Sequence, residues 1–216
     1  MRKEETMDTQ ERDRILNSAE GKFFSQGFVK VTVDEIAEDL GMSKKTIYKF
    51  FPSKEEIMLG IMRMNMRRIE RQVISIVESS KPFDQKFSEF LNLLARLTSK
   101  IGKQFQKDVR TRLPELDKEI ETFRREKIFG RLRPMFLQAK EEGYLRKDLN
   151  DDIFMLVFIN AVQNIMTPSV LAEHAFSAEE AFRQIFRVLF EGALTDEARQ
   201  SFHFFDVPSN TQERIV

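Results

Sequence analysis

The stretch VDEIAEDLGMSKKTIYKFF, residues 33–51, decides the fold that we expect for this chain. It holds two short segments with the apolar spacing of a helix, residues 33–40 and 43–50, and Gly41 lies in the turn between them. Two short helices joined by a glycine-containing turn form a helix-turn-helix. The stretch therefore predicts this motif at about residues 33–52.

The second segment divides its side chains between two sides of a helical wheel drawn at about 100° per residue. One side is mostly apolar, includes Ile47, and can pack inward. No acidic residue occurs between Met42 and Lys54. An exposed basic helix behind a glycine turn can enter the major groove of DNA, where long cationic side chains reach base edges and phosphates. The side that would face the groove carries three lysines and a phenol: Lys44, Lys45, Tyr48 and Lys49.

The helix starts around this segment offer further contacts to a DNA backbone. Thr32 forms a capping box with Glu35, Ser43 is a second N-cap, and the free N–H groups of the first helical turns can hold phosphate oxygens. Lys54 opens the following helix and adds a cation. Taken alone, a lysine cluster on a short helix is usually a solvated face, and Tyr48 an ordinary half-buried tyrosine. The conjunction of caps, glycine turn and divided helical wheel favours DNA binding over that interpretation.

The rest of the chain has the helix-capping and helix-ending residues expected of an all-helical protein. Glycine and proline are scarce, with 8 and 6 residues, and no segment alternates apolar and polar residues as a half-buried strand does. Gly27 stands where a helix-ending glycine belongs and predicts a contact between Phe28 and Phe23. Pro134 predicts a kink in its helix. Helices are expected at about residues 8–26, where a capping box at Asp8 opens the first, and then at 54–79, 84–100, 117–142, 151–166 and 178–194.

The composition, 41% hydrophobic and 32% charged in 216 residues, suits a folded globular protein of one or two domains. The absence of cysteine excludes disulfides, thiolate metal sites and cysteine nucleophiles. The 35 basic and 35 acidic residues cancel, which argues against a nonspecific polycation but not against a locally basic site. The first fourteen residues lack the apolar core of a signal peptide, and the longest apolar run, residues 153–159, is shorter than the roughly 18 residues of a membrane span. We therefore expect a soluble, cytoplasmic protein with no membrane partner.

Residues 15–59, ILNSAEGKFFSQGFVKVTVDEIAEDLGMSKKTIYKFFPSKEEIML, resemble the N-terminal domain of the TetR family of transcription regulators. The resemblance implies an all-α fold, in which a three-helix helix-turn-helix domain precedes a larger helical bundle that dimerises through its last two long helices. We expect the DNA-binding domain over residues 1–54 and the regulatory and dimerisation domain over residues 55–206. Residues 207–216 show no periodicity and are expected to form a mobile tail.

The resemblance also implies DNA contacts residue by residue. It adds Thr46 to the contacts expected from the helical wheel. Phe50 departs from the pattern, because members of the family often place at this position a histidine that reaches the DNA backbone. The predicted DNA-contacting residues are Thr32, Ser43, Lys44, Lys45, Thr46, Tyr48, Lys49 and Lys54.

The last two long helices are candidates for a dimer interface. The helix at residues 178–194 is apolar over about half of its wheel, and the helix at 151–166 gathers uncharged amides on one side. The resemblance implies the same arrangement, and a homodimer can place two recognition helices about 34 Å apart on a palindromic site. Alternatively, both helices lie in the central core of a single chain and form no dimer interface. The predicted interface residues are Leu156, Asn160, Gln163, Asn164, Phe182, Ile185, Phe186 and Leu189.

Members of the TetR family usually bind a small effector inside the larger helical domain that follows the DNA-binding domain. The resemblance therefore implies a repressor that binds a palindromic operator and is released when a small lipophilic effector shifts its conformational population. Phenylalanines at helical spacing form a core more often than a ligand pocket, and this alternative stays open. The candidate pocket residues are Phe90, Leu94, Phe105, Phe123, Met155, Phe158 and Val162.

Two other classes of function compete with this interpretation. An enzyme is disfavoured because His174 and His203 have no partners at metal-ligand or triad spacing, and because no glycine-rich phosphate loop occurs. We therefore expect no catalytic residue, no metal site and no cofactor. The alternative is a helical interaction protein that keeps the fold without specific DNA binding, which the Phe50 departure leaves open. Steep salt dependence of DNA affinity would separate the two.

Overall fold

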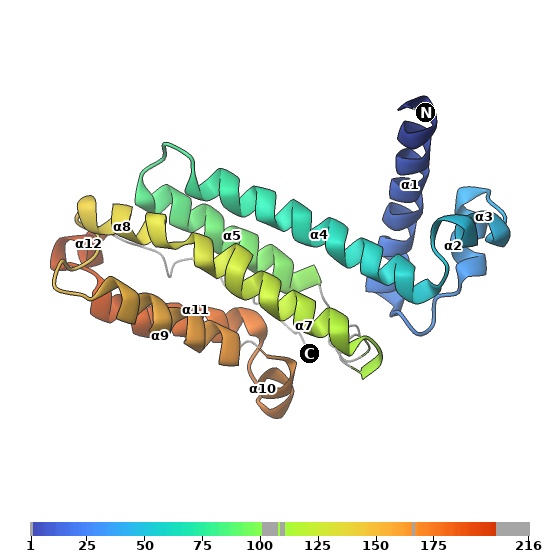
Figure 1. Ribbon diagram of the computed structural model, residues 1–216. Coiled ribbons are helices and arrows are strands. Elements are labelled where there is room, and N and C mark those ends of the chain that lie inside the picture. Colours follow the sequence, from blue (N-terminus) through green and yellow to red (C-terminus); the bar gives the residue numbers. More distant parts are fainter. Residues whose placement is uncertain (1, 101–107, 109–110, 166, 202–216) are drawn as a thin grey trace, which may run out of the picture. The chain divides into compact units, whose positions relative to one another are not determined.

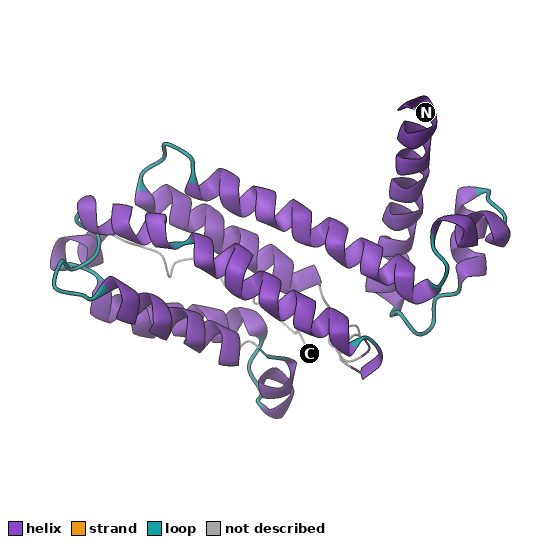
Figure 2. Cartoon of the chain, in the orientation of Figure 1, coloured by secondary structure: helices purple, strands orange, loops and turns teal. Residues whose placement is uncertain are grey.

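The computed structural model describes residues 2–100, 108, 111–165 and 167–201. These residues form helices joined by loops, and they include no strand (Figure 2). The all-helical class expected from the sequence is confirmed. The elements, labelled in Figure 1, are α1 (Arg2–Gln26), α2 (Val33–Leu40), α3 (Lys44–Phe50), α4 (Lys54–Val77), α5 (Phe83–Lys100), α7 (Pro114–Phe123), the π-helix η1 (Arg124–Ile128), the 3-10 turn η2 (Phe129–Arg131), α8 (Arg133–Glu141), α9 (Asp151–Ile165), α10 (Pro168–Glu173), α11 (Ala178–Ala193) and α12 (Asp196–Ser201).

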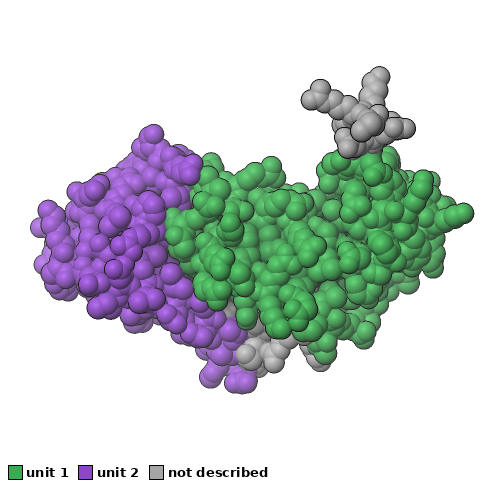
Figure 3. All heavy atoms as spheres, viewed as in Figure 1, with its two compact units in different colours: residues 1–75, 96–131 green, residues 76–95, 132–216 purple. Residues whose placement is uncertain are grey.

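The chain divides into two compact units, which are coloured separately in Figure 3. Unit 1 comprises residues 1–75 and 96–131, and unit 2 comprises residues 76–95 and 132–216. Unit 1 therefore contains α1–α3, most of α4 and all of α7, whereas unit 2 contains α8–α12. The predicted domain boundary at residue 54 stays a prediction. No helix among the described residues is long and apolar enough to cross a membrane.

The first helix begins earlier than the sequence predicts. α1 starts at Arg2, so Asp8 lies inside the helix and the predicted capping box there is wrong. The residues before Asp8 include no glycine or proline, and their long charged side chains favour helix. The predicted end is confirmed, since Gly27 has φ 89° and its N–H donates to the Phe23 carbonyl at 3.1 Å. The predicted aromatic contact also forms, with the rings of Phe23 and Phe28 edge to face at 5.4 Å.

The single helix expected over residues 117–142 is wrong, because two helices with an irregular segment between them occupy this region. α7 ends at Phe123, and the chain passes through η1 and η2 before α8 begins at Arg133. Pro134 falls in the first turn of α8, where a missing N–H costs no helical hydrogen bond. The proline that predicted a kink thus marks the start of a new helix.

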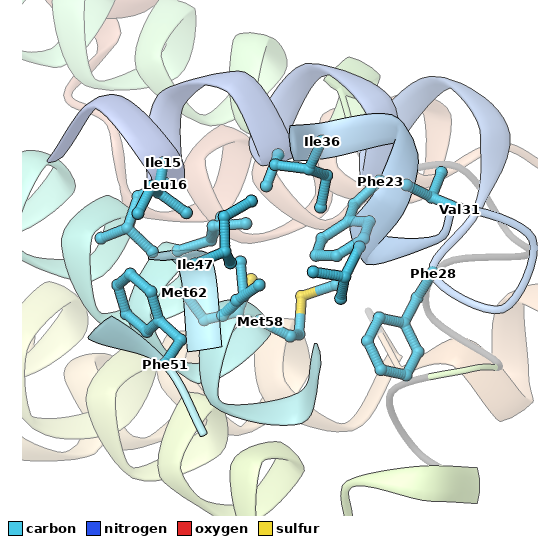
Figure 4. Packing of buried hydrophobic residues seen from close by; sticks show 14 of the residues in the cluster. Ile15, Leu16, Phe23, Phe28, Val31, Ile36, Ile47, Phe51, Met58 and Met62 are labelled. Carbon is cyan, nitrogen blue, oxygen red and sulfur yellow. The ribbon is translucent and has the colours of Figure 1, made fainter. Parts of the chain in front are cut away.

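One apolar core joins the three N-terminal helices to α4 and α7 within unit 1 (Figure 4). Because each buried isoleucine or phenylalanine stabilises the folded state by about 1.5–3 kcal/mol, this core holds α2 and α3 against α1 as one body. The N-terminal helix-turn-helix followed by a larger helical region is confirmed. Buried residues that form the core include Ile15, Ala19 and Phe23 of α1, Ile36 of α2, Ile47 of α3, Ile57, Met58 and Ile61 of α4, and Leu116 of α7.

The core of unit 2 is a cluster of phenylalanines. Phe158 of α9 meets Phe186 of α11 with ring centroids 4.9 Å apart, and Phe87 of α5 lies 5.0 Å from Phe186. Offset and tilted aromatic pairs at these distances pack favourably beyond the area they bury. Unit 2 is therefore built around aromatic contacts among α5, α8, α9 and α11, whose further members are Phe83, Phe136, Phe154 and Phe190.

Candidate nucleic-acid interface

The start of α2 is fixed by a reciprocal hydrogen-bonding pair. The Thr32 hydroxyl accepts a hydrogen bond from the Glu35 N–H at 3.3 Å, and the Glu35 carboxylate accepts one from the Thr32 N–H at 2.6 Å. The predicted capping box is confirmed. The Thr32 N–H, and the Thr32 hydroxyl at 2.9 Å, both donate to the ionised carboxylate and thereby lower the pKa of Glu35.

Replacing Glu35 by glutamine should make stability less dependent on pH. A carboxyl group whose pKa is lowered by folding stabilises the folded protein at pH values above its ordinary pKa of 4.5. That stabilisation is lost as the pH falls through the lower pKa of the folded state. Wild type should therefore exceed Glu35→Gln in free energy of unfolding at pH 7, and the difference should shrink below pH 4.5. Urea denaturation at several pH values measures this. Glu38→Gln, a change of the same charge at an exposed site of α2, is the control, and a pH-independent difference for Glu35→Gln would contradict the account.

The turn between α2 and α3 depends on a left-handed residue. Gly41 has φ 62° and ψ 30°, a conformation that a side chain disfavours. Its N–H donates to the Glu38 carbonyl at 3.1 Å, and the Met42 N–H donates to the Ala37 carbonyl at 2.9 Å. The turn thereby satisfies the last carbonyls of α2 and sets the direction in which α3 leaves.

α3 buries one side and exposes the other, as its helical wheel predicts. Ile47 is fully buried, whereas Tyr48 is 40% exposed. The Ser43 hydroxyl caps the helix, accepting from the Thr46 N–H at 3.0 Å, and lies 2.8 Å from the Thr46 hydroxyl. Residues of the basic face that are also exposed are Lys44, Lys45 and Lys49. The structure thus brings the predicted contact residues of α3 together at one exposed helix.

Lys44 is held by an acidic residue of the preceding helix. Its ammonium lies 2.8 Å from the Asp34 carboxylate, and this hydrogen bond raises the pKa of Lys44. Both side chains remain in contact with solvent, so the pair orients Lys44 and contributes little to stability. Lys45 and Lys49 make no ion pair within the described part of the chain, and their charges are available to a polyanion.

Lys54 has a role within the chain that the sequence did not predict. Its ammonium donates to the carbonyls of Val31 at 2.7 Å and Val29 at 3.2 Å, and it lies 4.7 Å from the centroid of the Phe28 ring. Partial burial lowers the pKa of this ammonium. Lys54 therefore anchors the loop between α1 and α2, and its contact with DNA stays a prediction.

One residue of the interface was missed by sequence reasoning. Arg12 of α1 donates from Nη1 to the carbonyl of Phe50, the last residue of α3, at 2.9 Å. Sequence reasoning considered only the apolar residues of this helix and did not single out Arg12. Arg12 precedes Leu16 by one helical turn, and this spacing could have placed it on the side of α1 that faces the core.

The predicted dimer residues lie partly on the surface and partly inside unit 2. Leu156, Asn160 and Asn164 of α9 are exposed, whereas Ile185 and Phe186 of α11 are buried within the protomer. Gln163, Phe182 and Leu189 have intermediate exposure. Three further exposed apolar residues on these helices were absent from the predicted interface: Ile153, Val157 and Val188, which are 62%, 46% and 71% exposed.

The predicted effector residues are divided between the two units, and their role as a pocket stays a prediction. Phe90, Met155, Phe158 and Val162 are buried in unit 2, and Leu94 is half-buried there. Phe123 belongs to unit 1, and Phe105 lies outside the described residues. An open groove of about 600 Å³ in unit 1 includes Phe123, but its other lining residues are mostly charged, among them Arg63, Arg67, Glu70, Glu119 and Lys127.

Comparison of the sequence with known proteins matches a family model to the helix-turn-helix region and also finds a longer match to a related regulator. Residues 15–61 match the model of the bacterial regulatory proteins, tetR family. Over 192 residues the chain is 23% identical to YvaF of Bacillus subtilis, an uncharacterized HTH-type transcriptional regulator, and the match covers 85% of this chain and 96% of that one. It is 32% identical over 65 residues to the HTH-type transcriptional regulator EthR of Mycolicibacterium smegmatis, a match that covers 30% of each chain.

Solved structures share the fold over most of the chain. SmeT, the repressor of the Stenotrophomonas maltophilia multidrug efflux pump SmeDEF, gives a TM-score of 0.60 at 14% identity, over 87% of this chain and 92% of that one. A transcriptional regulator from Saccharomonospora viridis in complex with choline gives a TM-score of 0.65 at 18% identity, over 87% of this chain and 99% of that one. At these identities the likeness concerns the fold.

Proposed function

This chain belongs to the TetR family of DNA-binding transcription regulators, and we propose that it is a repressor that binds a palindromic operator as a homodimer. The membership also agrees with the expectation that the chain is not an enzyme. The repressor assignment is supported by the similarity of its fold to SmeT, which represses an efflux pump.

The observation that carries the proposal is the exposed basic face of α3. Ile47 packs the helix into the core of its domain and Ser43 caps its start, while three lysines and Tyr48 remain on the surface. Lysines can contact phosphates and base edges, and a tyrosine can add a hydrogen bond or an apolar contact in the major groove. Thr32, Thr46 and Lys54 are proposed as supporting contacts at the edges of this face.

The homodimer is supported by the surface of α9. The exposed positions of this helix after Asp152 are apolar or carry an uncharged amide, among them Ile153, Leu156 and Asn160. α9 packs against α11, whose Val188 is 71% exposed. An apolar surface of this kind marks an interface more often than a solvated face. A twofold dimer through it can present two copies of α3 to the two halves of a palindrome.

Release by a lipophilic effector is the regulatory part of the proposal. Its support is the set of buried aromatic and apolar side chains in unit 2, which a ligand could enter if they separate. Such a ligand acts by binding better to a state that does not fit the operator. Operator affinity that stays constant across saturating lipophilic metabolites would count against it.

Selection of random duplex DNA by the purified protein tests the proposed function. We expect enrichment of a palindrome with half-sites about 34 Å apart, and weaker enrichment by Tyr48→Ala and Lys44→Ala. Lys118→Ala is the matched control, because this lysine is 71% exposed on α7 and ion-paired to Glu115 at 3.0 Å. Enrichment of an isolated half-site would contradict the homodimer. No enrichment by folded protein would favour a helical interaction protein that does not read DNA.

A further inference from the structure

The two ends of α3 make different contacts with the rest of the domain, and at its start Lys44 pairs with Asp34 of α2 at 2.8 Å. At its start the Ser43 hydroxyl accepts from the Thr46 N–H at 3.0 Å, which is a contact within the same helix. At its end the guanidinium of Arg12, from α1, donates to the Phe50 carbonyl at 2.9 Å. This contact joins residues 38 positions apart and therefore fixes α3 to another element.

Arg12 also contacts the residue that terminates α3. Its guanidinium carbon lies 4.6 Å from the centroid of the Phe51 ring, a cation–π geometry. Phe51 is only 2% exposed. Its ring packs against α4 so closely that a Cβ on Gly60 would lie 3.2 Å from Cε1 of Phe51. Figure 4 shows Phe51 and Leu16 on the same side of the core, so the end of α3 is held where α1 and α4 meet.

The physical chemistry of a short helix makes this contact important. α3 spans only Lys44–Phe50, and the last carbonyls of a helix lack partners within it and carry partial negative charge. A guanidinium at this end donates a hydrogen bond to one carbonyl, and its positive charge interacts favourably with the negative end of the helix dipole. A helix of this length has little stability of its own, so its direction depends on contacts with its neighbours.

We propose that Arg12 is a positioning residue that sets the direction of the recognition helix and so determines how well the protein discriminates its operator from other DNA. The inference rests on the proposed reading of DNA by α3. Base contacts require hydrogen bonds of about 2.7–3.2 Å, so a tilt of α3 disrupts them. Attraction of the lysines to phosphates tolerates such a tilt. Loss of the Arg12 contact should therefore weaken specific binding more than nonspecific binding.

Arg12→Met tests the proposal, with Arg14→Met as its matched control. Arg14 lies on the same helix and pairs with Glu11 at 2.8 Å, so the control removes the same charge without touching α3. We expect Arg12→Met to lower the ratio of specific to nonspecific affinity about tenfold, with Arg12→Lys between it and wild type. The salt dependence of nonspecific binding should not change. Arg14→Met should match wild type in the ratio.

Three outcomes would overturn the proposal. An equal loss of specific and nonspecific affinity, with a salt slope lower by about one per protomer, would make Arg12 a phosphate contact. An unchanged ratio in folded Arg12→Met would deny it any role in positioning. If Arg12→Lys and Arg12→Met both kept the wild-type ratio of specific to nonspecific affinity and lowered only the free energy of unfolding, the role of Arg12 would be merely structural.

Hydrogen exchange in the DNA-free protein separates this proposal from the proposed function. We expect the α3 amides to exchange about tenfold faster in Arg12→Met than in Arg14→Met, because their helix has lost its tie to α1. Unchanged exchange would overturn the inference even if wild type selects a palindrome. If the α3 amides exchanged faster in Arg12→Met but wild type selected no operator, the contact between Arg12 and α3 would be upheld and the proposed function rejected.

Discussion

Replacing Lys44, Lys45 and Lys49 together by alanine is expected to lower affinity for the selected operator by at least about 100-fold near physiological salt. All three lysines are exposed on the face of α3 opposite Ile47, so their removal should leave the fold intact. Each lysine that contacts a phosphate releases a counterion, and the salt slope should fall by about one per lost contact. Fluorescence anisotropy with labelled operator at several salt concentrations measures both quantities.

A variant with three lysines removed elsewhere controls for total charge. Lys118, Lys127 and Lys147 are exposed and lie outside the helix-turn-helix, so their replacement by alanine changes the net charge equally. We expect it to retain most of the operator affinity. Similar losses in the two triple variants would show that α3 does not hold the DNA-contacting surface, and would also remove the basis for Arg12 as a positioning residue.

The helix-turn-helix could be predicted because its geometry is determined by neighbours in sequence. Thr32 and Glu35 are three residues apart, and the Gly41 turn follows directly from the end of α2. Phe23 and Phe28 meet because Gly27 ends α1 between them. Such contacts follow from local spacing, since capping and left-handed turns require particular residue types at particular positions.

The contacts that orient the interface could not be predicted, because they join residues that are distant in sequence. Lys44 pairs with Asp34 across two helices, and Lys54 donates to carbonyls of a loop that precedes α2. Arg12 reaches Phe50 across the whole motif. The sequence identifies Lys44 and Lys54 as cations at helix starts and does not single out Arg12. Only the packing of α1, α2 and α4 shows which carbonyl or carboxylate each one meets.

In unit 2 the sequence identified apolar helices but not the side that each one buries. Ile185 and Phe186 belong to the aromatic core of their own protomer, while Val188 on the same helix is 71% exposed. A helix that is apolar over half of its wheel allows either outcome, because the position of the neighbouring helices decides which residues they cover. The proposed dimer surface therefore shifts toward Val188 and the exposed side of α9.

Replacing Leu156 and Val188 by aspartate should convert the proposed dimer to a monomer and lower operator affinity by at least about 100-fold. Leu156 is 60% exposed, so the two carboxylates would be hydrated in a monomer but desolvated without partners at an interface. A monomer presents a single α3 to one half-site and loses the second set of contacts. Sedimentation velocity measures the association state, and anisotropy with operator DNA measures the affinity.

Leu137→Asp is the control for this surface. Leu137 is 38% exposed on α8, and the change introduces the same acidic group at another apolar position of unit 2. The control should sediment as wild type does. If the double variant remains a dimer, the exposed apolar residues of α9 and α11 do not form the interface. If it becomes monomeric but keeps its operator affinity, one recognition helix suffices for binding, and the palindromic reading of DNA by two copies of α3 is wrong.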